Sequence, residues 1–145
     1  MTPISEFKKI FDVNFFSIIY ICQICARFMA RNKKGVICNV SSSTSLTSDK
    51  GTLVYGSSKA SLNYATKVIS KELADSGIRV NAVAPGVTDT DMLKQMDSEA
   101  IKNQLKSSSL KKIASASQIA GVILFLCSDL SSHMTGQIIS VDGGI

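Results

Sequence analysis

Residues 78–86 read Ile78-Arg79-Val80-Asn81-Ala82-Val83-Ala84-Pro85-Gly86, an apolar run with two polar residues that ends in a proline and a glycine. Short apolar runs rich in β-branched side chains are typical of buried strands, and a Pro-Gly pair interrupts regular structure. Residues 78–84 are therefore predicted to form a buried strand that opens into a loop at Pro85.

Two further strands are predicted on either side of this stretch in the chain. Residues 36–40 are short and β-branched-rich, and residues 137–141 follow Gly136. The segments between the strands have helical character, because apolar residues recur every three or four positions over residues 54–76, which end at Gly77. Ser115 and Gln118 form a capping box for a helix through Leu126. Strands separated by helices predict an α/β fold with a parallel sheet and right-handed crossovers.

A long amphipathic helix is predicted before the first strand. Thr2 can cap free N–H groups, and Pro3 suits the first helical position. Asn14 is the only polar residue on the apolar stripe of this helix, and a buried amide needs a hydrogen-bond partner. The stripe runs through Phe7, Phe11, Asn14, Ile18, Cys22, Cys25 and Met29.

Composition favours one globular domain over residues 1–145, because 45% of the residues are hydrophobic and 19% are charged. The net charge of +5 is modest, and the lysine pairs lack interleaved aromatic residues, so nucleic-acid binding is not expected. The longest apolar stretch, residues 15–29, is interrupted by polar residues and is shorter than the ~20 residues of a membrane-spanning helix. No membrane association is therefore predicted.

The four cysteines lie in apolar runs, where free thiols behave as small buried hydrophobes, and this usage fits a reducing cytoplasm. Cys22 and Cys25 form a C-x-x-C pair. No second pair follows, and His133 is the only histidine, so core packing is expected rather than a metal site.

Ligands of a parallel sheet gather beyond the carboxyl ends of its strands, which here means residues 41–45, 85–90 and 142–144. Tyr55 and Lys59 are four residues apart, so they share one face at the start of the second helix. An ammonium group beside a phenol favours the phenolate and so assists proton transfer. Taken alone, this spacing also fits an ordinary pair on a helix surface.

Four motifs together resemble the short-chain dehydrogenase/reductase family. Ser42 stands 13 residues before Tyr55, the spacing of the family's catalytic serine, and Asn14 matches the family's helical asparagine. The C-terminal pattern resembles the short, non-extended branch of the family. The matching segments are Asn39-Val40-Ser41-Ser42, the Tyr55 to Lys59 pair, Arg79 to Gly86 followed by Thr88, Thr90 and Asp91, and Thr135-Gly136-Gln137 with Val141-Asp142-Gly143-Gly144.

The resemblance implies catalytic roles for Asn14, Ser42, Tyr55 and Lys59. Tyr55 would be the general acid that protonates the carbonyl oxygen, or the base in the oxidative direction. Ser42 would polarise the same oxygen. Lys59 would hold the nicotinamide ribose and assist Tyr55, and the region of Asn14 would hold a water that relays protons.

The resemblance also implies an NAD or NADP cofactor. Tyr55 and Lys59 would contact it, together with the loop residues Pro85, Gly86, Thr88 and Thr90. Locally, that loop also fits an ordinary turn from a strand to a helix. Gly86 would let the backbone come close to the nicotinamide.

The family's Gly-rich G-x-x-x-G-x-G turn does not occur in these residues. All 145 residues resemble the later, catalytic portion of the family, so the expected fold is a partial Rossmann-like doubly wound parallel sheet, the last three strands with their flanking helices. The N-terminal dinucleotide-binding half is not represented, and we expect a fragment or truncated product with impaired cofactor binding.

The sequence therefore predicts an oxidoreductase similar to 3-oxoacyl-(acyl-carrier-protein) reductases, acting on a small carbonyl or acyl-thioester substrate and forming homo-oligomers. One alternative is a catalytically silent remnant that only self-associates through its two long helices. Another is a basic module that meets an acidic carrier protein, although a solvated helix face explains the same lysines. Those lysines are Lys94, Lys102, Lys106, Lys111 and Lys112.

Overall fold

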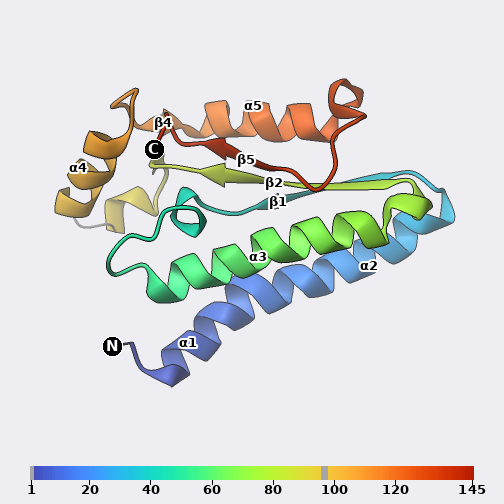
Figure 1. Cartoon of the computed structure of the whole chain (residues 1–145), viewed down its shortest axis with the longest axis horizontal. Helices are drawn as coiled ribbons and strands as arrows, with labels where there is room; N and C mark the ends of the chain where they lie inside the picture. Colours follow the sequence, from blue (N-terminus) through green and yellow to red (C-terminus); the bar gives the residue numbers. More distant parts are fainter. Residues whose placement is uncertain (1, 96–97) are drawn as a thin grey trace.

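The computed structural model describes residues 2–95 and 98–145 and contains a three-stranded parallel sheet with helices on both faces (Figure 1). The strand order is β1-β2-β5, so β2 lies in the centre. This is the predicted α/β arrangement. The strands are β1 (Gly35–Val40), β2 (Ile78–Pro85) and β5 (Ile138–Val141), each within about two residues of its predicted range.

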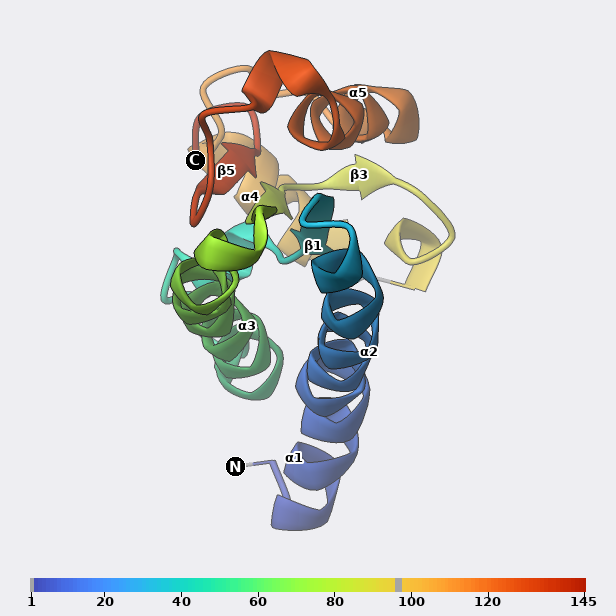
Figure 2. The same ribbon diagram turned by 90° about the vertical axis from the view of Figure 1, so that its right-hand side faces the viewer.

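The helices form two layers around this sheet (Figure 2). On one face lie α2 (Ser17–Arg31) and α3 (Leu53–Glu72), and on the other face lies α5 (Ala116–Cys127). Ala26 of α2 packs on Ile78 and Val80 of β2, with Met29, Ile37 and Ile69 around them. Helix α3 and the later part of α2 therefore cover one face of the sheet, while the earlier part of the N-terminal helix packs against α3.

Strand β2 is the buried centre of the molecule, and its two polar residues are fully paired. Arg79 donates to the carbonyls of Leu126, Ser128 and Met134 at 3.0–3.1 Å, which ties β2 to the end of α5. Asn81 donates to the Met134 carbonyl at 2.8 Å and accepts from the Gln137 N–H at 3.0 Å. A buried strand tolerates these side chains because the segment before β5 supplies backbone partners.

The N-terminal helix is longer and less regular than predicted. It begins with α1 (Ile4–Phe11), passes through a π-helical turn, η1 (Asp12–Phe16), and continues as α2. Pro3 occupies the N-cap position and no side chain caps the helix, so the predicted capping by Thr2 is wrong. The helical conformation starts one residue later than a Thr2 cap requires.

The continuous helix Ile4–Arg31 has 28 residues and a window of mean hydropathy 1.5. By length and composition it is long enough to cross a membrane, because the helix extends well before the residues 15–29 considered from the sequence. The same helix also packs on the sheet, because Ala26 contacts Ile78 and Val80 of β2. The absence of membrane association stays a prediction.

The ends of the other helices follow the predicted chemistry. After α3 a 3-10 turn, η3 (Ala74–Ser76), leads to Gly77, whose φ of 68° is the left-handed terminus expected there. Helix α5 begins with the predicted capping box, in which Ser115 accepts from the Gln118 N–H and the Gln118 side chain accepts from the Ser115 N–H. Another 3-10 turn, η5 (Asp129–Ser131), follows α5.

A smaller unit lies at the carboxyl end of the sheet. Strands β3 (Thr88–Asp89) and β4 (Ala114–Ser115) pair in parallel. Between them lie a 3-10 turn, η4 (Leu93–Gln95), and α4 (Ser98–Ser107). This unit spans residues 88–115, of which residues 96–97 lie outside the described residues.

The cysteines are free, and one of them departs from the prediction. Cys22 is buried, Cys25 and Cys38 are partly buried, and Cys127 is exposed. Burial raises the pKa of the Cys38 thiol to about 11, and the neighbouring Cys127 contributes to this shift. Cys127 is exposed because it lies at the end of α5, a helix that the sheet covers on one side only.

Candidate active site

The carboxyl ends of the three strands meet at one edge of the sheet, as predicted. Val40 is paired with Val83 and Pro85 with Val141, so the strands end at similar heights. Gly86 continues the contact, because its N–H donates to the Val141 carbonyl at 3.0 Å. The segments after β1, β2 and β5 therefore form one continuous edge.

Gly86 is required here by a contact that the sequence did not reveal. A Cβ atom at this position would lie 2.8 Å from Cα and 2.9 Å from Cβ of Asp142. Glycine is therefore needed at position 86 because the backbone after β5 comes close to it, whether or not a cofactor also does. The motif Asp142-Gly143-Gly144 and the Pro85-Gly86 turn are packed directly together.

This contact makes Gly86→Ala a destabilising substitution. We expect a loss of about 1–3 kcal/mol in the free energy of unfolding, because an added methyl group forces the two backbone segments apart. The matched control is Gly121→Ala in α5, where a Cβ atom meets nothing within 4 Å and alanine is a better helix former. Urea unfolding of both variants is the measurement. Equal stability of Gly86→Ala and the wild type would contradict the contact.

Ser42 follows β1 and shapes the turn η2 (Ser43–Ser45). Its hydroxyl accepts from the Thr44 N–H at 3.3 Å and lies 2.7 Å from the Thr44 hydroxyl, while its carbonyl accepts from the Ser45 N–H at 3.0 Å. The side chain is partly buried. The Ser42 hydroxyl is therefore oriented by hydrogen bonds within the turn that follows it. The neighbouring Thr44 hydroxyl can donate a proton to it or accept one from it.

The first turn of α3 packs closely on this serine turn. A Cβ atom at Gly56 would lie 3.0 Å from the Thr44 carbonyl oxygen, a separation shorter than ordinary van der Waals contact. Farther along α3, Asn63 donates to the Ser45 hydroxyl at 2.7 Å. Glycine next to Tyr55 thus allows the helix to approach η2, which brings Tyr55 to the edge occupied by Ser42.

Tyr55 and Lys59 lie on the same side of α3, as their spacing predicted. The Lys59 ammonium is 6.0 Å from the centroid of the Tyr55 ring and donates to the Val40 carbonyl at 2.9 Å. Burial lowers the pKa of Lys59 from its usual value. The lysine therefore carries its charge at a partly desolvated position between the end of β1 and the tyrosine ring, where that charge acts more strongly than in water.

Asn14 lies in the middle of the π-helical turn η1, a distortion that is often found at functional sites. Its amide donates to the Ser58 hydroxyl at 3.3 Å, and Ser58 in turn donates to the Tyr55 carbonyl at 2.7 Å. The partner predicted for Asn14 is thus Ser58, and the pair connects the N-terminal helix to the backbone of Tyr55.

Ser58 is the residue of this site that sequence reasoning missed. It is fully buried and precedes Leu62 by four residues, so it occupies the apolar stripe of α3 as a polar residue. The argument that singled out Asn14 applies equally to this serine. If the search for polar residues on apolar stripes had covered both helices, it would have identified Asn14 and Ser58 together.

The loop of residues 85–90 lies at the same edge, attached to β5 and β4 rather than to α3. The Thr88 hydroxyl donates to the Gly86 carbonyl at 3.0 Å, and the Thr90 hydroxyl lies 3.5 Å from the Thr88 carbonyl. Among the described residues, no hydrogen bond joins this loop to Tyr55 or Lys59. The edge therefore presents two groups: Ser42, Tyr55 and Lys59 on one side, and the Pro85 to Thr90 loop on the other.

Comparisons with known proteins agree on what this arrangement resembles. The family model described as enoyl-(acyl carrier protein) reductase matches residues 1–145. The chain is 40% identical over 138 residues to a 3alpha-hydroxysteroid dehydrogenase of Mediterraneibacter gnavus, covering 95% of this chain and 55% of the relative. It is also 40% identical over 141 residues to a 3-oxoacyl-(acyl-carrier-protein) reductase of Chlamydia muridarum, covering 97% and 56%.

Solved structures give the same result. A 7alpha-hydroxysteroid dehydrogenase, complexed with NADH and 7-oxo glycochenodeoxycholic acid, superposes with a TM-score of 0.93 at 32% identity, covering 99% of this chain and 56% of the other. The 3-oxoacyl-(acyl-carrier-protein) reductase from Brucella melitensis gives 0.92 at 31% identity, covering 100% and 54%. The chain spans about half the length of the relatives it matches.

Proposed function

Because the chain belongs to the short-chain dehydrogenase/reductase family, we propose that it is the catalytic portion of an NAD(P)-dependent oxidoreductase that reduces a carbonyl group or oxidises a secondary alcohol. The observation that carries the proposal is the placement of Lys59, whose ammonium bridges the end of β1 and the Tyr55 ring. This contact puts the lysine charge where β1 ends, and Ser42 lies in the segment that follows β1.

Each of these side chains has a role that its position supports. Tyr55 protonates the carbonyl oxygen in the reductive direction, and Ser42 donates a hydrogen bond to the same oxygen. Lys59 supplies the positive charge that favours release of the tyrosine proton. Asn14 supports the tyrosine through Ser58, since their hydrogen bonds end on the Tyr55 carbonyl.

The residues fit one end of a nicotinamide cofactor, which supplies a hydride to the carbonyl carbon when it is bound. The Tyr55 hydroxyl and the Lys59 ammonium are suitable partners for ribose hydroxyls, and Pro85, Gly86, Thr88 and Thr90 lie along the same sheet edge. The diphosphate end has no counterpart among the 145 residues, which hold no G-x-x-x-G-x-G turn. The choice between NAD and NADP depends on residues of that other half.

We propose a 3-oxoacyl thioester or a related ketone as substrate, because several of the relatives are 3-oxoacyl-(acyl-carrier-protein) reductases. The test joins this chain to a cofactor-binding half of the same family and follows NAD(P)H absorbance with 3-oxoacyl thioesters and with ketosteroids. Turnover of at least one ketone is expected. A stably folded joined protein that turns over neither class would favour the non-enzymatic alternative.

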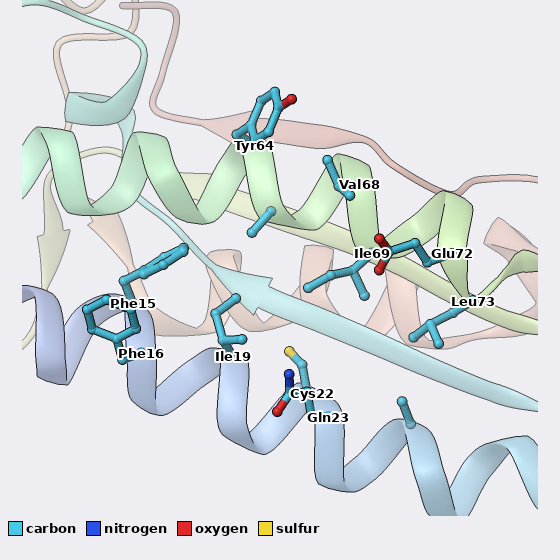
Figure 3. A pocket seen from close by; sticks show the side chains of 12 residues that line it. Phe15, Phe16, Ile19, Cys22, Gln23, Tyr64, Val68, Ile69, Glu72 and Leu73 are labelled. Atoms are coloured by element: carbon cyan, nitrogen blue, oxygen red, sulfur yellow. The ribbon is translucent and has the colours of Figure 1, made fainter.

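A groove between α2 and α3 supports self-association as a second property. The groove has a volume of about 410 Å³ and is lined by Phe15 and Val68 among others, and Figure 3 shows Ile19 of the N-terminal helix and Ile69 of α3 directed toward each other across it. Two aromatic residues that line the groove, Phe16 and Tyr64, are 48% and 73% exposed. Apolar patches of this kind mark interaction sites in soluble proteins, so we propose that a second copy covers this groove.

Val68→Glu tests this interface, because it places a charge in the groove. We expect sedimentation at tens of micromolar to show dimers or larger oligomers for the wild type and at least a tenfold weaker association for the variant. Leu130→Glu is the matched control, since Leu130 is 83% exposed and lies in η5, beyond the groove. A well-folded wild-type monomer at these concentrations would contradict the proposal.

A further inference from the structure

Three lysine side chains converge on a hollow of about 280 Å³ at the carboxyl end of the sheet. Lys102 and Lys106 come from consecutive turns of α4, and Lys111 comes from the connection that follows α4. Leu105 is the fourth lining residue, and no acidic side chain of the described chain lines this lysine hollow. Lys94, by contrast, pairs with Asp91 at 2.7 Å, away from the hollow.

The connection that carries Lys111 is fastened on both sides. Before it, the Leu110 N–H donates to the Gly143 carbonyl at 2.9 Å, and after it the Ala114 N–H donates to the Val87 carbonyl at 3.0 Å. Lys111 itself has a φ of 50°, which is uncommon for a residue with a side chain and persists where the surroundings fix it. Its backbone, and with it the origin of its side chain, is therefore held in place.

The lysine hollow lies at the same end of the sheet as the proposed active site. Gly143 is the second residue after β5 and Val87 directly follows the Pro85-Gly86 turn, so the connection lies across the carboxyl ends of β5 and β2. Figure 1 shows α4 at the end of the sheet where α3 begins, the end that carries Tyr55. A substrate whose carbonyl lies near Tyr55 can extend toward α4.

We propose that the lysine hollow is a subsite for an anionic group, a phosphate or a carboxylate, at the end of the substrate remote from its carbonyl. This inference rests on the proposed oxidoreductase function. Ligand pockets usually exceed about 300 Å³, so a hollow of 280 Å³ suits one group of a larger ligand. Three ammonium groups supply the charge, and Leu105 offers an apolar surface for the adjoining alkyl chain.

Anion binding is tested first without any turnover, by acetylating the lysines of the 145-residue chain and measuring each rate by mass spectrometry. The probes share one tail: hexyl phosphate, hexanoate and the neutral 1-hexanol. We expect at least one anion to slow the acetylation of Lys102, Lys106 and Lys111 about threefold or more, and 1-hexanol to have no effect. Equal rates with and without both anions, or equal slowing at the exposed Lys8 and Lys9, would overturn the proposal and leave a solvated helix face.

Two further comparisons sharpen this test. Lys102→Ser combined with Lys111→Ser should weaken binding of the protecting anion about tenfold, whereas Lys8→Ser combined with Lys9→Ser, which removes the same charge, should change it less than twofold. Binding of a phosphate and binding of a carboxylate can be distinguished by their pH dependence, because the second pKa of a phosphate is about 6. Protection by hexyl phosphate should weaken between pH 7.5 and pH 6, while protection by hexanoate should remain, because carboxyl groups titrate at about pH 4–5.

The place of the hollow in the substrate site is tested with the chain joined to a cofactor-binding half. For a ketone ending in a carboxylate or phosphate, the two lysine substitutions should raise KM about tenfold and leave kcat unchanged, with no effect on the matching neutral ester. If the joined protein turned over the charged ketone and the matching neutral ester with equal KM, the substrate assignment would be overturned. Protection of the lysines without turnover of any ketone would instead overturn the proposed function and leave an anion site.

Discussion

The 145-residue chain by itself is expected to show little or no NAD(P)H-dependent reduction of a carbonyl, although the proposed catalytic residues Ser42, Tyr55 and Lys59 are present. Hydride transfer requires the nicotinamide to be held against the substrate, and orientation of reacting groups is worth about 7–11 kcal/mol of barrier. The diphosphate normally provides that anchoring, at a glycine-rich turn and a helix N-terminus. These residues contain no such turn, so most of this contribution is absent.

The measurement compares the 145-residue chain with the same chain joined to a cofactor-binding half, using NADH and NADPH with 3-oxoacyl thioesters. We expect a difference in kcat/KM of at least about 10⁵-fold, the lower range of measured effective molarities. Circular dichroism of the short chain serves as the control for folding. Cofactor binding and turnover by the short chain at rates near those of the joined protein would refute this expectation.

The second large effect is expected for Tyr55→Phe in the joined protein. Removing the hydroxyl removes the proton donor for the carbonyl oxygen, so kcat should fall about 10²- to 10⁴-fold. The aromatic ring stays, and with it the contact with the Lys59 ammonium at 6.0 Å. Stability should therefore change little. Cofactor affinity should fall no more than about tenfold, because one hydrogen bond to the ribose is lost while Lys59 stays, and cofactor fluorescence measures that affinity directly.

Tyr20→Phe is the matched control for this substitution. It removes the same atom from a tyrosine of α2 that is 67% exposed and lies outside the candidate site. The control should keep full activity. If Tyr55→Phe also kept full activity, Tyr55 would not be the acid, and if both variants lost cofactor binding, the loss would reflect a general disturbance of the fold.

Elements whose signals are local could be predicted from the amino-acid sequence. The strand β2 was recognisable because its apolar run ends at Pro85-Gly86, and its neighbours were recognisable from their short β-branched runs. The capping box at Ser115 and the left-handed Gly77 were equally predictable, because each depends on residues within a few positions in the chain. The spacing of Tyr55 and Lys59 placed them on one side of a helix for the same reason.

Contacts between residues that are distant in the chain could be identified only in the folded structure. The partner of Asn14 is Ser58, 44 residues away, and the atoms that require glycine at position 86 belong to Asp142. Exposure of Cys127 and convergence of the lysines on one hollow likewise depend on how α5 and α4 are placed against the sheet. Such contacts leave no periodic pattern in the sequence, because the positions of whole helices and strands, rather than the conformation of neighbouring residues, bring their atoms together.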